Sequence, residues 1–230
     1  MRNLKRNLKN VMDRINQATV ASGRDPESVR LVAVSKTIPA ETVKRAIDAG
    51  ANILGENYIQ EAKSKFDDLI SYPVSWHFIG HLQTNKAKYA VRIFDLIHSV
   101  DSFKLALELN KHAGKTGKIQ HILIQVNVAG ESSKSGISTQ DTMNLIKKIS
   151  ALKNLAIKGL MTMPPFFNEP EKVRPFFKDL RNLRDTIRSE RIDNVDMEEL
   201  SMGMTGDFEA AIEEGATLVR IGTAIFGERN

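Results

Sequence analysis

Short apolar segments alternate with helical patterns along the whole chain, and this alternation restricts the possible folds more than any other feature of the sequence. Eight of these segments have the pattern of buried strands. They span residues 31–35, 52–55, 76–80, 96–100, 119–128, 157–161, 199–202 and 217–221. Strands that alternate with helices are expected to pair in parallel, because each helix returns the chain to the same edge of the sheet.

Helical patterns fill the intervals between the strands. Examples are residues 40–49, 102–113, 139–152, 169–190 and 207–214. Gly50, Gly114 and Gly215 each stand just past one of these patterns, where helices commonly end. An open, doubly wound sheet is the rival arrangement, but eight strands in 230 residues favour a closed barrel. We therefore predict a single α/β domain over residues 1–230, folded as a (β/α)8 TIM barrel.

The composition excludes several classes of site and partner. The chain has no cysteine, which excludes disulfides, thiolate nucleophiles and cysteine-ligated zinc and is compatible with a cytoplasmic location. Lys and Arg total 33 against 28 Asp and Glu, and the two signs are mixed along the chain. This mixture is typical of solvated helix faces, so we expect no nucleic-acid partner, whereas a small anionic ligand is compatible with it.

Membrane and targeting segments are not expected either. No stretch approaches the roughly 18 apolar residues that a membrane helix needs. The basic residues 1–6 are not followed by the apolar run of a secretory signal. Asp13 and an apolar stripe over residues 4–15 favour an ordinary surface helix there over a transit peptide.

Polar residues stand at the carboxyl ends of most predicted strands. They are Lys36, Glu56, Asn57, His81, Ser99, Asp101, Asn127, Ser201 and Arg220. The carboxyl ends of barrel strands share one face, and active sites of this fold are built there. We expect these side chains to converge on one mouth.

Lys36 is the most reactive candidate among them. It ends the apolar run 31–34, and Pro39 stands where the next helix is expected to begin. Burial lowers the pKa of a lysine in general, and an unprotonated lysine can form a Schiff base with an aldehyde. The segment taken alone fits a solvated loop lysine better.

Two glycine-rich turns follow the last two predicted strands, at residues 201–207 and 220–227. In barrels of this kind, phosphate is commonly bound by the loops after strands seven and eight. Exposed backbone N–H groups favour an anion there, and the hydroxyls of Ser201 and Thr223 could add hydrogen bonds. The glycines could instead serve only to make tight turns.

A lysine and a phosphate-binding turn at one mouth are what pyridoxal 5'-phosphate (PLP) requires. Arg220 could face the ring nitrogen of this cofactor, and it would keep that nitrogen unprotonated because an arginine cannot accept a proton. A salt bridge from Arg220 to Glu199 or Asp207 is the alternative.

The motifs around these residues resemble the YggS/PROSC family of pyridoxal phosphate homeostasis proteins, whose fold is the barrel of the alanine racemase N-terminal domain. The similar segments span residues 33–37, 55–61, 76–83, 133–136, 159–161, 200–204 and 219–227. The resemblance implies that Lys36 carries the cofactor, that Ser201 and the Gly222–Thr223 backbone hold its phosphate, and that Arg220 faces its ring nitrogen. The resemblance also implies that Asn57 lies beside the cofactor. We add His81 and Met202 to the predicted cofactor site.

The sequence departs from the racemases that share this barrel. At the sixth strand the racemases have a motif similar to Gly-Leu-Met-Thr-His, and this chain has Met163 in place of the histidine. A second domain of the racemases supplies their catalytic tyrosine. The chain ends soon after Gly227, so we expect no such domain. Two-base racemisation needs a proton donor on each face of the Cα atom.

We therefore expect a protein that stores, buffers or delivers PLP inside the cell, with apo PLP-dependent enzymes as partners, as a monomer and without robust catalysis. A PLP-dependent amino-acid racemase or lyase is the alternative. A phosphosugar enzyme with Lys36 as base and Arg220 as phosphate clamp is a third hypothesis.

Two other patterns predict no site. The loop 130–136 lacks the Gly-Lys-Ser/Thr core of a nucleotide-binding P-loop and is expected to close over the mouth, with Lys134 at the rim. The five histidines lack the spacing of metal ligands, so no metal is expected.

Overall fold

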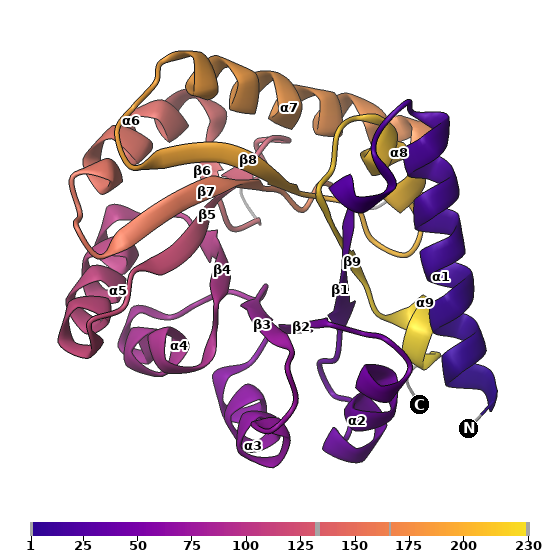
Figure 1. The fold of residues 1–230 in the computed structure, drawn as a ribbon. Coiled ribbons are helices and arrows are strands. Elements are labelled where there is room, and N and C mark those ends of the chain that lie inside the picture. The colour runs from indigo at the N-terminus through magenta and orange to yellow at the C-terminus, as the bar shows by residue number, and fades with distance from the viewer. Residues whose placement is uncertain (1, 132–133, 166, 229–230) are drawn as a thin grey trace.

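Eight parallel strands of the described residues close into a barrel in the computed structural model (Figure 1). The strands are β1 (Arg30–Val34), β2 (Ile53–Glu56), β3 (Ser75–Phe78), β4 (Leu96–Val100), β5 (Gln120–Asn127), β7 (Leu155–Met161), β8 (Val195–Ser201) and β9 (Leu218–Ile221). Their order is β4-β3-β2-β1-β9-β8-β7-β5, and the pairing of β4 with β5 closes the ring. The predicted (β/α)8 TIM barrel is confirmed. A two-residue strand, β6 (Ile137–Ser138), pairs with β5 outside this ring.

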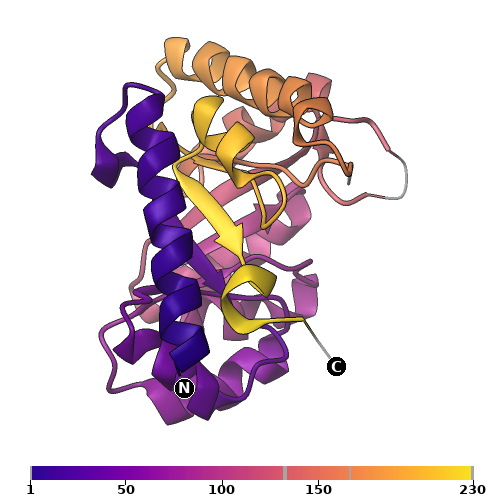
Figure 2. The same ribbon diagram turned by 90° about the vertical axis from the view of Figure 1, so that its right-hand side faces the viewer.

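Helices surround the barrel on its outer side (Figure 1). They are α1 (Arg2–Ala21), α2 (Ala40–Asp48), α3 (Ile59–Leu69), α4 (Ala87–Ile93), α5 (Phe103–Thr116), α6 (Thr139–Ser150), α7 (Arg174–Ser189), α8 (Phe208–Glu213) and α9 (Thr223–Phe226). Short 3-10 turns lie at Pro26–Ser28, Thr84–Lys86 and Pro170–Lys172. Helix α1 runs alongside α8 and α9, as Figure 2 shows, and so joins the two ends of the chain.

The structure describes residues 2–131, 134–165 and 167–228. Ser132 and Ser133 of the predicted rim loop lie outside the described residues. None of the helices in the described ranges is long and apolar enough to span a membrane.

Of the boundaries that differ from the sequence prediction, two have clear physical reasons. Helix α5 continues through Gly114 and ends at Gly117, whose φ of +67° makes it the left-handed C-cap, so the predicted end at Gly114 was wrong. Strand β8 begins at Val195, four residues before the predicted start. Its first half alternates charged and apolar residues, and Asp196 and Glu198 are exposed, which hides the strand from a search for apolar runs.

The barrel has apolar packing on both faces of its strands. Most buried residues belong to a large cluster that joins the strands to the surrounding helices. A smaller cluster contains Val32, Ile53, Ile79, Leu96, Leu123, Met161 and Leu218. Successive residues of a strand point to opposite faces, and Val32 lies between Leu31 and Ala33 of the large cluster. The smaller cluster therefore lies in the interior of the barrel.

Gly159 allows β7 and β8 to approach each other closely. Its φ is +155°, and a Cβ atom at this position would lie 1.9 Å from the carbonyl oxygen of Glu199. The register between the strands shifts at this point, between Ile157 and Gly159. A side chain at residue 159 would push apart the strands that lead to the mouth.

We expect Gly159→Ala to lower the free energy of unfolding by about 3 kcal/mol or more, because overpacking against backbone adds to an unfavourable φ. Urea unfolding followed by circular dichroism measures this. Gly117→Ala is the matched control, since no atom lies within 4 Å of its added Cβ and only the left-handed φ opposes it. Its cost should be about 1–2 kcal/mol. Equal losses in the two variants would contradict the close contact with Glu199.

Candidate cofactor site

A cavity of about 270 Å³ opens at the carboxyl ends of the strands. Five of the predicted site residues line it, namely Lys36, Asn57, Arg220, Gly222 and Thr223. The remaining lining residues are Val34, Ile79, Met163, Phe167, Met204, Thr205, Gly206 and Asp207. The predicted site did not include Thr205 or Asp207, which are polar residues of the same lining.

Lys36 follows β1 by two residues and is half-buried at the cavity. The chain turns sharply after it, because Thr37 adopts a left-handed φ of +65°. The backbone N–H of Thr37 donates to the Glu61 carboxylate of α3, and its hydroxyl donates to the carbonyl oxygen of Lys36 at 2.6 Å. These bonds hold the backbone around Lys36 in one conformation.

A network of charged side chains, formed by Glu56, Lys65 and Glu61, stabilises the turn at Lys36. Glu56 is fully buried, and its Oε1 atom accepts hydrogen bonds from Lys65 Nζ at 2.8 Å and from Ser35 Oγ at 2.7 Å. Lys65 Nζ also donates to Glu61 Oε1 at 2.7 Å and to the carbonyl oxygen of Ser35 at 2.5 Å. Burial raises the pKa of Glu56, while Lys65 and Ser35 favour its charged form. The network fixes the peptide that precedes Lys36.

Asn57 follows β2 and borders the cavity. Gly80 packs directly on it, since a Cβ atom at residue 80 would lie 2.2 Å from the Asn57 carbonyl oxygen. The side-chain Oδ1 atom of Asn57 is buried and accepts no hydrogen bond from the described residues. A ligand with a donor group could satisfy this atom.

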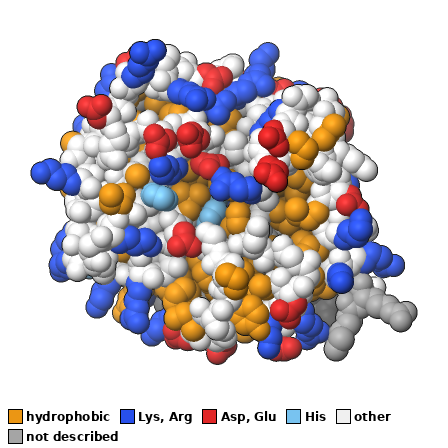
Figure 3. All heavy atoms as spheres, viewed as in Figure 1, with side chains coloured by type: hydrophobic (Ala, Val, Ile, Leu, Met, Phe, Trp, Pro, Cys, Tyr) orange, Lys and Arg blue, Asp and Glu red, His pale blue; other side chains and the backbone are white. Residues whose placement is uncertain are grey.

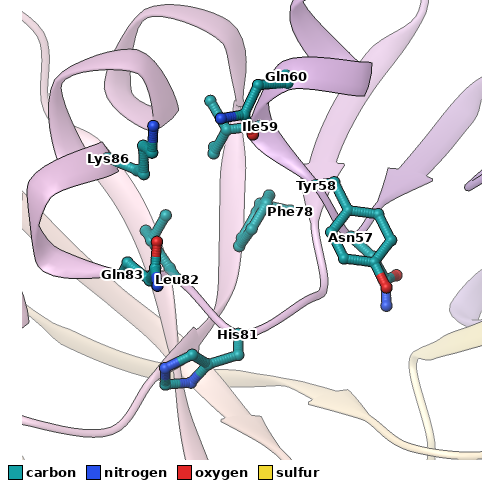
Figure 4. Close-up of a pocket in the computed structure, with 9 residues that line it drawn as sticks. All are labelled: Asn57, Tyr58, Ile59, Gln60, Phe78, His81, Leu82, Gln83 and Lys86. Atoms are coloured by element: carbon teal, nitrogen blue, oxygen red, sulfur yellow. The ribbon is translucent and has the colours of Figure 1, made fainter.

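His81 lies at a neighbouring cavity instead of the one that Lys36 lines. This second cavity has a volume of about 430 Å³ and shares Asn57 with the first. Figure 4 shows His81, Gln83 and Lys86 around it, on a floor that contains Phe78. The structure thus places His81 next to the cavity that Lys36 lines, and its role toward a cofactor stays a prediction.

Gly222 and Thr223 form the turn from β9 into α9. A Cβ atom at residue 222 would lie 3.2 Å from the carbonyl oxygen of Val34, so glycine lets this turn pack closely on the end of β1. The turn after β8 is fixed by Asp207, whose Oδ1 atom accepts a hydrogen bond of 2.6 Å from the backbone N–H of Met204. Both glycine-rich turns reach the cavity.

Ser201 and Met202 lie beneath the cavity and do not line it. Both are fully buried, and Met202 packs toward the surrounding helices. The Ser201 hydroxyl contacts Arg220 Nη1 at 2.6 Å and His98 Nδ1 at 2.8 Å. In the structure the buried Arg220 uses this hydroxyl as an acceptor, and the contact of Ser201 with a phosphate stays a prediction.

Arg220 is buried inside the barrel and reaches the cavity from β9. Its Nη2 atom donates to the carbonyl oxygen of Thr162 at 2.8 Å. Burial lowers the pKa of Arg220 to about 10, and the charge of Asp207 opposes this shift. Glu199, one of the predicted alternative partners, pairs instead with Arg30. Arg220 therefore remains charged at neutral pH and is held from two sides.

No group of three or more histidine or carboxylate side chains within the described ranges could hold a metal ion. The polar groups around the cavity comprise an amine, a guanidinium, an amide, two threonine hydroxyls and two backbone turns, while the Asp207 carboxylate that also borders it accepts from the Met204 N–H. Such donors suit an organic anion that carries a carbonyl group, and PLP has both an aldehyde and a phosphate.

Comparison with known proteins agrees with this donor set. The family model described as alanine racemase, N-terminal domain, matches residues 1–230. A pyridoxal phosphate homeostasis protein of Aquifex aeolicus is 46% identical over 222 residues, which cover 96% of each chain. The protein of the same name from Escherichia coli K12 is 40% identical and covers all of this chain and 98% of its own length. The structure of PipY from Synechococcus elongatus with PLP bound has a TM-score of 0.81 and 35% identity, covering 93% of this chain and all of that one.

We expect Lys65→Met to lower the free energy of unfolding by about 3–5 kcal/mol, because Glu56 would remain buried without its cation. The double variant Glu56→Gln/Lys65→Met should recover part of this loss, since it leaves no unpaired charge. Lys63→Met is the control, because Lys63 is exposed on the same helix and should change stability by less than about 0.5 kcal/mol. Equal stability of the two single lysine variants would show that the network is not needed.

Proposed function

Because the chain belongs to the alanine racemase N-terminal domain family, and within it to the pyridoxal phosphate homeostasis proteins, we propose that it binds PLP through Lys36 and takes part in the intracellular homeostasis of this cofactor. The observation that carries the proposal is the shared cavity of Lys36, Arg220 and the Gly222–Thr223 turn. Storage, buffering and delivery are the roles that this binding would serve.

The cavity residues match the three parts of the cofactor. Lys36 would supply the amine that condenses with the cofactor's aldehyde, with release of water. The backbone N–H groups of Gly222 and Thr223 suit the phosphate, since two glycine-rich turns let an anion approach closely. Arg220 suits the ring nitrogen, and the buried Oδ1 atom of Asn57 offers an acceptor beside it.

Arg220 argues for a binding role over catalysis. Bound PLP supplies an electron sink for carbanions, which works best when its ring nitrogen is protonated. A guanidinium with a pKa of about 10 stays charged at neutral pH and can only donate, so it keeps this nitrogen unprotonated. Met163 borders the cavity at the position where racemases have a histidine, and it has no proton to give.

The surface is compatible with the partners that we propose, which are apo PLP-dependent enzymes in the cytoplasm. Figure 3 shows Lys and Arg interspersed with Asp and Glu on the face seen in Figure 1, as expected for a protein that does not bind nucleic acid. Met163 at the cavity is 41% exposed, so an acceptor or solvent can reach the mouth. We propose that the protein acts as a monomer.

Borohydride treatment of the PLP-loaded protein should fix a pyridoxyl group on Lys36, which peptide mass spectrometry detects. Lys36→Ala should abolish both the label and the near-visible absorption of the complex. Lys63→Ala, on the exposed face of α3, is the matched control and should retain both. Recovery of the label on another lysine, with Lys36 unmodified, would contradict the assignment. A protein without near-visible absorption after incubation with PLP would favour a phosphosugar enzyme.

The amino-acid racemase is the second candidate, and deuterium exchange at Cα separates it from the binding protein. We expect the PLP-loaded protein to exchange the Cα hydrogen of L-alanine no faster than free PLP does. The loss of one acid–base group costs on the order of 100- to 10,000-fold in rate. Rapid exchange that disappears in Lys36→Ala would restore the racemase or lyase.

A further inference from the structure

Four buried polar side chains form a line through the interior of the barrel, from the cofactor cavity toward β3. Arg220 Nη1 lies 2.6 Å from Ser201 Oγ, Ser201 Oγ lies 2.8 Å from His98 Nδ1, and His98 Nε2 lies 3.0 Å from His77 Nδ1. They come from β9, β8, β4 and β3, and each is at most 4% exposed. Only Arg220 of the four borders the cavity.

The chemistry of these groups gives the line one direction. An arginine can only donate, so Ser201 Oγ accepts from Arg220. The Ser201 hydroxyl hydrogen then points to His98 Nδ1, which must be unprotonated to accept it. His98 therefore carries its proton on Nε2 and donates to His77 Nδ1. If His98 Nδ1 instead donated to Ser201 Oγ, the Ser201 hydroxyl hydrogen would have no acceptor among its described neighbours. A buried donor without an acceptor is destabilising.

The surroundings keep both histidines uncharged. Burial, and then the neighbouring Arg30, lower the pKa of His77 to about 3, while Asp95 opposes this. Burial, His77 and Arg220 together hold the pKa of His98 well below its usual value. Because both imidazoles are neutral, they do not repel the charged Arg220 guanidinium at the end of the line.

We propose that Ser201, His98 and His77 form a directional hydrogen-bond chain that holds the Arg220 guanidinium in place, which makes His98 a positioning residue for the cofactor's ring nitrogen. The inference rests on the proposed function only where it concerns the cofactor. The chain and the carbonyl oxygen of Thr162 fix the guanidinium from two sides. Its remaining N–H groups are then available to the cavity.

Nitrogen-detected NMR of the histidine rings in the cofactor-free protein tests the chain itself. We expect His98 and His77 to be neutral between pH 6 and 8, each with its proton on Nε2. Detection of His98 with its proton on Nδ1, or of a charged ring, would overturn the direction that we infer. This measurement involves no PLP, so its outcome does not depend on the proposed function.

Substitutions of His98 test its effect on the cofactor site. His98→Gln should preserve the chain, because an amide oxygen can accept from Ser201 while the amide N–H donates to His77. His98→Leu breaks the chain, and we expect it to weaken PLP binding about tenfold and to shift the near-visible absorption of the complex. A general loss of packing would not shift this absorption selectively or be rescued by glutamine.

The melting temperature of each cofactor-free variant shows whether it is folded. If His98→Leu does not fold, Ser201→Ala replaces it, since this variant removes the acceptor of Arg220 and should cause the same spectral shift. A folded His98→Leu or Ser201→Ala with unchanged affinity and absorption would overturn the positioning role. If the wild-type protein itself fails to bind PLP, the proposed function and the role of His98 toward the cofactor both fail, whereas the NMR result still decides the chain.

Discussion

The closure of the parallel sheet between β4 and β5 is the constraint on which the rest of the structure depends. Closure brings the carboxyl ends of all strands to one rim, and it also encloses an interior that side chains must fill. Lys36 follows β1 and Arg220 lies on β9, and these two strands pair, with Val32 opposite Arg220. The residue proposed to attach the cofactor and the residue proposed for its ring nitrogen therefore come from paired strands and line one cavity.

Arg220 then determines which polar residues the interior contains. A buried guanidinium needs acceptors for its N–H groups, since an unmet buried charge is strongly destabilising. Ser201 and the Thr162 carbonyl provide them, and His98 in turn gives the Ser201 hydroxyl an acceptor. The apolar cluster around Val32 occupies other interior positions. The small apolar cluster and this polar line thus share the interior of the barrel.

The sequence predicts the position of a site residue well where that residue directly follows a strand. It predicts the position poorly where contacts between distant strands determine which groups the side chain meets. Lys36 and Asn57 were placed correctly at the cavity because the strand ends before them are clear. Ser201 was assigned to the phosphate because its turn is rich in glycine. Its contact with His98 joins residues 103 positions apart, which no local pattern reveals. Phe167, in an irregular loop, lines the cavity without any periodic signal.

Two separate hydrogen-bond networks of the protein's own side chains hold the two sides of the cavity. Glu56 and Lys65 fix the peptide before Lys36, while Ser201 and Thr162 hold Arg220. A site that is already ordered loses little conformational entropy on binding and has no need to close over its ligand. The mouth can then stay open to solvent while the contacts at its base remain strong. An open mouth favours the exchange of a cofactor with an acceptor, whereas catalysis on a carbanion gains from the exclusion of water.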